Sequence, residues 1–227
     1  MHPTQVLKAW RTGLNRRQIA WGAAAALLGA STLGMAQGAA AETLRIVPST
    51  TITVLDPIWT TAYVTRNFGY MVFDTLFGTD AQGKIQPQMV GKWTTSADNK
   101  TWTFTLRDGL AFSDGAAVTS EDVIASLKRW SSRDTLGGLM AQSLDRYEAV
   151  DAKTFQIVLK QPFGLMLEAL GKPSSNVPFI MPRRIAETPG DTQIKEIVGS
   201  GPYLFKADEF RPVSYTHLRA HETRHDL

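Results

Sequence analysis

The stretch that decides the fold is VGKWTTSADNKTWTFTLRDG, residues 90–109. Its second half alternates strictly, with Trp102, Phe104 and Leu106 on one side and three threonines on the other. A period of two is typical of a β-strand that buries one face. The polar residues 96–100 supply a turn between this strand and one that begins at Trp93. The stretch therefore predicts a β-hairpin with one face in the core.

A capped helix is predicted shortly after this hairpin. Thr119 is followed three residues later by Asp122, in the manner of a capping box, which marks a helix start. Val123, Leu127 and Trp130 then recur at i, i+4 and i+7. This spacing places the three side chains on one apolar face.

Shorter predicted elements lie on both sides of these two. In chain order they are a strand over 44–47, a helix over 62–76, a turn over 79–84, a hairpin over 147–160, a helix over 165–170 and a strand over 203–205. The hairpin turns at 151–153 and presents Phe155, Ile157 and Leu159 to the core. Helices and hairpins alternate without internal repeats, which predicts a mixed α/β layer structure.

The first 41 residues have the pattern of an export signal. A basic start that includes Arg16-Arg17 precedes a charge-free apolar run over 19–36, and small residues at 39–41 suit signal peptidase. We expect cleavage before Glu42 and a periplasmic destination, by the Sec or the twin-arginine route. The alternative is a membrane anchor, but a glycine-interrupted run of about 18 residues is at the lower limit for a bilayer.

This leader also accounts for the basic pI of 9.2. The whole chain has 24 basic and 21 acidic residues. Residues 1–41 hold four of the basic residues and no acid, so the rest has 20 against 21, a net charge of −1. No basic surface of the kind that follows phosphates is indicated, and we expect no nucleic-acid partner.

Several kinds of catalytic chemistry are missing from residues 42–213. This segment has neither His nor Cys, so histidine triads, thiol nucleophiles and the common zinc sites cannot be built from it. Phosphate-loop and dinucleotide glycine patterns are absent as well. Carboxylate pairs among Asp56, Asp74, Asp114 and Glu168 stay open as an alternative. We predict that the protein is not an enzyme and uses no metal or cofactor.

The last fourteen residues, 214–227, do not follow the pattern of the preceding segments. They are polar, show no turn or strand signal and include His217, His221 and His225. On a helix, the i, i+4, i+8 spacing would gather these histidines into a metal site. The interpretation that we prefer is an artefactual tail, because the segment resembles a translated adapter or vector sequence.

The aromatic residues allow two interpretations. The five in question are Trp93, Trp102, Phe104, Phe112 and Trp130. They could form a sugar-stacking platform, which would make the chain a free-standing sugar-binding module. Their period-2 and helical placement instead favours packing in a core.

Residues 90–109, with FSDG at 112–115 and VTSEDV at 118–123, resemble the signature of the family 5 solute-binding proteins. These proteins serve ABC importers of peptides, nickel and opines. Three further pieces match in order: LDP at 55–57, the hairpin over 150–159 and GSGPY at 199–203. The resemblance extends over residues 42–212.

The resemblance implies a fold of the type II periplasmic-binding-protein kind, with mixed sheets flanked by helices and two lobes joined by a hinge. It divides the chain into a signal peptide (1–41), the start of the first lobe (42–66), a subdomain attached to it (67–195), an incomplete return to the first lobe (196–213) and the tail (214–227). The second lobe is expected to be missing, which would make this chain an N-terminal fragment.

The function that the resemblance implies is capture of a peptide or similar small solute in the cleft between the lobes, and delivery to an ABC permease in the inner membrane. Ser49, Thr50, Thr51 and Ile52 match a stretch that approaches the ligand in relatives, and their hydroxyls can hydrogen-bond a peptide main chain. The alternative for this stretch is a plain polar turn. Tyr70 is a second candidate for ligand contact, its alternative being to pack under its helix.

Overall fold

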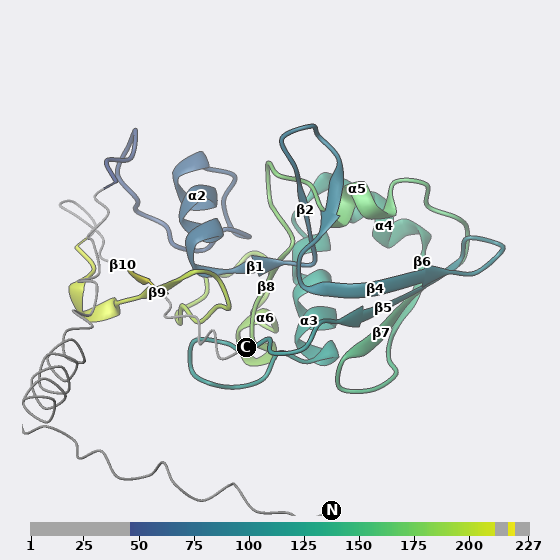
Figure 1. The fold of residues 1–227 in the computed structure, drawn as a ribbon. Coiled ribbons are helices and arrows are strands. Elements are labelled where there is room, and N and C mark those ends of the chain that lie inside the picture. The colour runs from purple at the N-terminus through teal and green to yellow at the C-terminus, as the bar shows by residue number, and fades with distance from the viewer. Residues whose placement is uncertain (1–45, 212–217, 221–227) are drawn as a thin grey trace, which may run out of the picture. The chain divides into compact units, whose positions relative to one another are not determined.

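The computed structural model describes residues 46–211 and the backbone of Leu218–Ala220 (Figure 1). The predicted signal peptide and the three tail histidines lie outside the described residues. Pro48 onward belongs to one unit of structure, and Ile46 and Val47 belong to a separate one. The predicted first strand is wrong at Ile46 and Val47, which have no regular secondary structure and are exposed.

Both predicted hairpins are confirmed, and they join into one antiparallel sheet. Its strands are β4 (Val90–Thr95), β5 (Thr101–Leu106), β6 (Leu144–Ala149) and β7 (Thr154–Leu159), in the order β4-β5-β7-β6. Trp93 pairs with Phe104, and Phe104 pairs with Phe155. The rings of Phe104 and Phe155 stack with centroids 5.2 Å apart, and both are fully buried.

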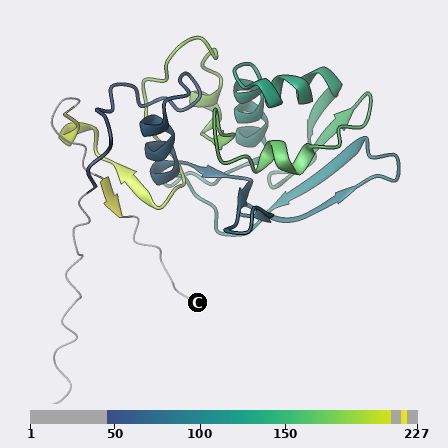
Figure 2. The same ribbon diagram turned by 90° about the horizontal axis from the view of Figure 1, so that it is seen from above.

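The predicted capped helix is α3 (Ser120–Ser131), and its capping box is present. The Asp122 carboxylate accepts a hydrogen bond from the backbone N–H of Thr119 at 2.8 Å, while the Thr119 hydroxyl accepts one from the Asp122 N–H at 3.4 Å. Val123, Leu127 and Trp130 are fully buried, as their spacing predicts. The helix packs against β6 and β7, with α4 (Thr135–Ser143) beside it (Figure 2).

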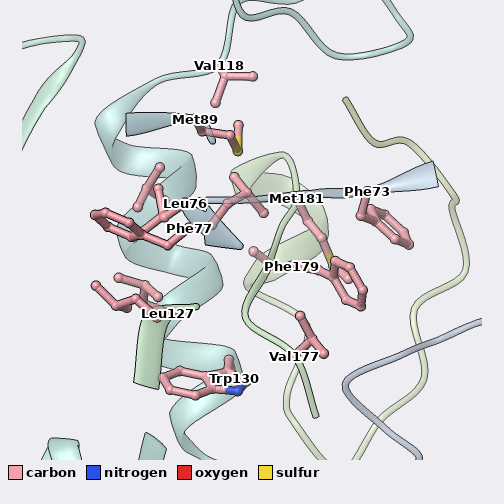
Figure 3. Close-up of a cluster of buried hydrophobic side chains, with 14 of the residues drawn as sticks. Phe73, Leu76, Phe77, Met89, Val118, Leu127, Trp130, Val177, Phe179 and Met181 are labelled. Carbon is pink, nitrogen blue, oxygen red and sulfur yellow. The ribbon is translucent and has the colours of Figure 1, made fainter. Parts of the chain in front are cut away.

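A second part of the core surrounds a strand pair that the sequence did not predict. β1 (Asp74–Thr75) pairs antiparallel with β8 (Phe179–Ile180), about a hundred residues later. The side chains that gather beside α3 around this pair include Phe73, Leu76, Phe77, Val177, Phe179 and Met181 (Figure 3). The preceding helix, α2 (Tyr63–Val72), stops four residues before its predicted end, because Phe73 is extended and leads into β1.

The other described elements are short. They are β2 (Phe77–Thr79), β3 (Ile85–Pro87), α5 (Met166–Leu170), α6 (Arg183–Ala186), β9 (Tyr203–Phe205), a 3₁₀ turn (Ala207–Glu209) and β10 (Leu218–Ala220). β10 pairs antiparallel with β9. The expectation that the tail contains no strand is therefore wrong at Leu218–Ala220. No helix in the described part of the chain is long and apolar enough to cross a membrane.

Two glycines let the 199–201 segment lie directly on the end of α2. The Gly201 N–H donates to the Val72 carbonyl at 2.9 Å, and a Cβ on Gly199 would overlap that same carbonyl oxygen. Backbone atoms can relieve such an overlap only by shifting a packed segment.

We expect Gly199→Ala to lower the free energy of unfolding by about 1–3 kcal/mol, the usual range for overpacking a core. The matched control is Gly164→Ala, because a Cβ there meets nothing within 4 Å. Urea unfolding of the two variants measures the difference. Equal unfolding midpoints for both variants would show that stability does not depend on the close contact between the 199–201 segment and the end of α2.

Candidate functional site

A buried ion pair fixes the segment that leads into α2. The Arg129 guanidinium, from α3, donates to both oxygens of Asp56, at 3.1 Å from Nη1 to Oδ1 and 2.7 Å from Nη2 to Oδ2. Both side chains are about 1% exposed. Paired, two-pronged geometry of this kind is the strong form of a charge-assisted hydrogen bond.

Both side chains of this pair also make hydrogen bonds to the backbone. Asp56 accepts from the backbone N–H groups of Ile58, Trp59 and Ile194 at 2.9–3.2 Å. Arg129 donates to the backbone carbonyls of Thr188 and Thr192 at 2.8 and 3.0 Å. The pair thus ties the Leu55-Asp56-Pro57 segment to α3 and to the 188–194 loop.

A buried amide supports the same segment from another side. The Asn176 Nδ2 lies 3.0–3.1 Å from the carbonyl oxygens of Pro57, Ile58 and Thr60. The backbone carbonyl of Asn176 accepts from the indole N–H of Trp130 at 2.7 Å. Residues 56–60 are therefore held rigidly, which positions the chain on either side of them.

The predicted ligand-contacting stretch lies just before this clamp. Ser49, Thr50 and Thr51 are exposed, and their hydroxyls have no hydrogen-bond partner among the described residues. Ile52 is half-buried and packs against the core. Two residues further on, the Val54 carbonyl accepts from the Thr65 hydroxyl of α2 at 2.8 Å. The stretch thus offers free hydroxyls on a segment that is anchored at its end.

Tyr70 lies on α2 and is 39% exposed. Its ring packs edge-to-face on Phe179, with centroids 5.0 Å apart. Burial raises the pKa of the Tyr70 phenol, and the nearby Arg66 guanidinium acts in the opposite direction. Part of the Tyr70 side chain is therefore packed, as the alternative interpretation of this residue predicts. The rest of the side chain faces solvent. Within the described residues no hydrogen bond joins it to residues 49–52.

Three of the four carboxylates considered for catalysis are engaged separately, and the fourth, Glu168, is exposed on α5. Asp56 binds Arg129, Asp74 accepts from the Gln88 side chain, and Asp114 pairs with Arg184 at 2.9 Å. No cluster of three or more His, Cys, Asp or Glu side chains in residues 46–211 could hold a metal ion.

The aromatic platform considered above is not formed by these residues. Phe104, Phe112 and Trp130 are buried in the core. Trp102 stacks on Phe104, and Trp93, which is 37% exposed, meets Phe77 edge-on. The spacing favoured packing in the core, and this prediction is confirmed for Phe104, Phe112 and Trp130. Trp102 also packs against the core, through its contact with Phe104.

Sequence reasoning missed a surface hollow of about 590 Å³ between α3 and the α6 region. Its lining includes Glu121, Lys128, Arg183 and Glu187. Arg183 pairs with Glu121 at 2.8 Å and with Glu187 at 2.6 Å, so these charges compensate one another. The hollow could not be anticipated because α6, a helix of four residues, has no periodic signal.

Asp74 is a buried carboxyl group whose pKa is shifted upward by the fold. Burial raises the pKa of its carboxyl from 3.8 to about 6, although Arg107 and the hydrogen bond from Gln88 oppose the shift. The folded state then holds more protons than the unfolded state between about pH 4 and 6. Stability must fall as the pH rises through this window, and the penalty persists above it.

We expect Asp74→Asn to raise the free energy of unfolding by about 3 kcal/mol at pH 8 and to change it little at pH 4, since a tenfold change in proton affinity is about 1.4 kcal/mol. The amide is nearly isosteric and can still accept from Gln88. Urea unfolding at several pH values measures this difference, with Glu168→Gln at an exposed position of α5 as the control. An increase in the free energy of unfolding that is the same at pH 4 and pH 8 would contradict the raised pKa of Asp74.

The family model of the bacterial extracellular solute-binding proteins, family 5 Middle, matches residues 84–223, which is more than half of the chain. The chain belongs to this family. The predicted family membership is confirmed, and this family is described by solute binding, without reference to a reaction.

Curated family 5 relatives extend the match toward the N-terminus. A probable peptide ABC transporter periplasmic-binding protein of Sinorhizobium fredii is 38% identical over 200 residues, covering 87% of this chain and 37% of that protein. A glutathione-binding protein of Salmonella typhi is 30% identical over 181 residues, covering 79% and 35%. This chain thus spans little more than a third of the length of these relatives.

Solved structures of solute-binding proteins share the fold. A binding protein from A. tumefaciens R10 in complex with mannopinic acid superposes with a TM-score of 0.64 at 29% identity, covering 75% of this chain and 35% of that one. The substrate-binding domain of an oligopeptide ABC transporter from Bacillus anthracis gives 0.63 at 20% identity, covering 78% and 37%. The predicted periplasmic-binding-protein fold with mixed sheets is confirmed.

Proposed function

We propose that this chain supplies the N-terminal part of an extracytoplasmic solute-binding protein, which captures a peptide or similar small solute and delivers it to an ABC permease in the inner membrane. The observation that carries the proposal is the family 5 match over residues 84–223 together with the 38% identical peptide-transport relative. Transport of this kind requires binding and release, and the proposal assigns no reaction to the chain.

The range of solutes is suggested by the relatives. The ligands named for relatives include glutathione, mannopinic acid, agropinic acid, a nonapeptide, the dipeptide Met-Leu and Fe(III)-EDTA. The Sinorhizobium fredii relative is named as a periplasmic-binding protein, which supports export of this chain. We further propose that the mature protein begins at Glu42. Either the Sec or the twin-arginine route fits the leader.

We propose that residues 42–66 open the first lobe, 67–195 form a subdomain attached to it, and 196–213 return to it. In support, the four-stranded sheet and its helices α3, α4 and α5 all come from within 67–195. In a two-lobed binding protein the ligand is enclosed by closure of the lobes, and the closed shape distinguishes loaded from empty protein.

The residues that we propose for solute contact in this lobe are Ser49, Thr50, Thr51, Ile52 and Tyr70. Three points support them: the hydroxyls are exposed and unpartnered within the described residues, Tyr70 is partly exposed, and the buried Asp56–Arg129 pair holds the adjoining segment. Groups fixed by a rigid scaffold bind with little loss of conformational entropy.

Nuclear magnetic resonance titration of the 227-residue chain with a mixture of dipeptides and tripeptides tests the proposal. We expect saturable shifts of the backbone amides of residues 49–52 and 70, at millimolar peptide. Maltose serves as the control, because it tests the sugar-binding alternative. Shifts produced by maltose alone, or by peptides only around the hollow between α3 and α6, would contradict the proposal.

A further inference from the structure

One exposed face of α2 carries two phenols and a cation. Tyr63, Arg66 and Tyr70 recur at i, i+3 and i+7, which places them along the same side of the helix. Tyr63 is 67% exposed and Tyr70 is 39% exposed, while Arg66 is half-buried and less exposed than either tyrosine. Large aromatic side chains exposed together on a short helix are unusual for a plain solvated surface.

The Arg66 guanidinium is held in place by neutral groups. Its central carbon lies 4.7 Å from the centroid of the Tyr63 ring, which is a cation–π distance. Its Nε and Nη2 donate to the Oδ1 of Asn67 at 3.3 and 3.0 Å. These contacts leave further N–H donors of the guanidinium available, since it has five.

The charge of Arg66 is not balanced nearby. α2 contains no acidic residue, and among the described residues no carboxylate lies within 4.0 Å of this guanidinium. Arg129, Arg146, Arg183 and Arg184 each pair with an acidic side chain, whereas Arg107 and Arg133 donate to backbone carbonyls. A fixed, uncompensated guanidinium matches a carboxylate better than any other small group, because its planar fork binds both oxygens.

Tyr70 lies four residues after Arg66, one turn further along the same side of α2. The guanidinium is one of the two influences on the Tyr70 phenol, and the edge-on contact with Phe179 fixes the ring. On the opposite, buried side of α2, the Thr65 hydroxyl donates to the Val54 carbonyl, which ties the 49–55 segment to the same helix. The three side chains therefore belong to the part of the chain to which we assign solute contact.

We propose that Tyr63, Arg66 and Tyr70 form a subsite that selects solutes with a free carboxylate. Arg66 binds the carboxylate, Tyr63 orients the guanidinium from one side, and the Tyr70 hydroxyl donates to a carboxylate oxygen or to a neighbouring polar group. This inference rests on the proposed function and extends it, because it names both the chemical class of the solute and two residues beyond those predicted.

The test compares two probes that differ only in the carboxylate, N-acetyl-dialanine and its C-terminal amide. Each is titrated into the 227-residue chain, and the backbone amide shifts of α2 are followed. We expect the acid to bind at least about fivefold more tightly than the amide. Arg66→Gln should remove this preference by weakening only the acid. Arg146→Gln, which changes an exposed arginine on β6, should leave both affinities unchanged.

The outcomes separate this inference from the proposed function. Equal binding of acid and amide by the wild-type chain, or an acid preference that survives Arg66→Gln, would overturn the carboxylate subsite and leave solute binding intact. A chain in which neither probe shifts α2, while a peptide mixture shifts residues 49–52, would also overturn the subsite alone. No shifts in either region with any peptide would overturn both proposals.

Discussion

Replacing Asp56 with alanine is expected to lower the free energy of unfolding by about 3–5 kcal/mol, because the change leaves the Arg129 charge buried without its partner. The guanidinium is about 1% exposed and cannot regain water without opening the fold. Three backbone N–H groups that donate to Asp56 would also lose their acceptor. Urea unfolding followed by circular dichroism measures the loss.

Two controls make this result specific. Glu148→Ala removes one partner of an exposed pair with Arg146 and is expected to cost no more than about 1 kcal/mol. The double variant Asp56→Ala with Arg129→Ala should lose less than the sum of the two single losses, since the second change removes the stranded charge. A loss below about 1 kcal/mol for Asp56→Ala would show that the pair does not hold residues 56–60 in place.

The second large effect concerns affinity. The 227-residue chain is expected to bind its solute about a thousandfold more weakly than the full-length product of its gene. A good pocket buries about 70–90% of a small ligand, and we propose that this chain supplies only one wall. Leaving about 150 Å² of apolar ligand surface in water forfeits about 4 kcal/mol, at about 25 cal/mol per Å².

Calorimetric titration with a mixture of dipeptides and longer peptides measures the affinity of the 227-residue chain. The same titration of the full-length product gives the reference affinity. The comparison needs matched pH and salt, because the proposed subsite contains a charge. Submicromolar binding by the 227-residue chain would mean that a second lobe is not required, and the two-lobe proposal would fail.

The elements that could be predicted from sequence are those with local and periodic patterns. The 90–109 hairpin, the second hairpin and α3 combine strict alternation or helical spacing with turn or capping residues, so local preference and burial agree. α4 was missed because Gly137 and Gly138 weaken both its helix propensity and its apolar pattern. β1 and β8 are two residues each and pair across about a hundred residues, which no local pattern reveals.

The candidate site was only partly predictable for a related reason. Hydroxyls at 49–51 are visible in the sequence, but their lack of partners depends on the surrounding fold. Arg66 is one arginine among many in the sequence, and only the structure shows that Tyr63 holds it and that no described acid pairs with it. The role of Asp56 was similarly hidden, since Arg129 is 73 residues away in the chain.

The measurement that tests the central claim most directly is a crystal structure of the full-length gene product with a peptide or small organic acid bound. We expect the solute to lie against residues 49–52 and the Tyr63–Arg66–Tyr70 face of α2, with a carboxylate on Arg66. A solute bound elsewhere on residues 48–211, such as in the hollow between α3 and α6, would contradict this account of the protein.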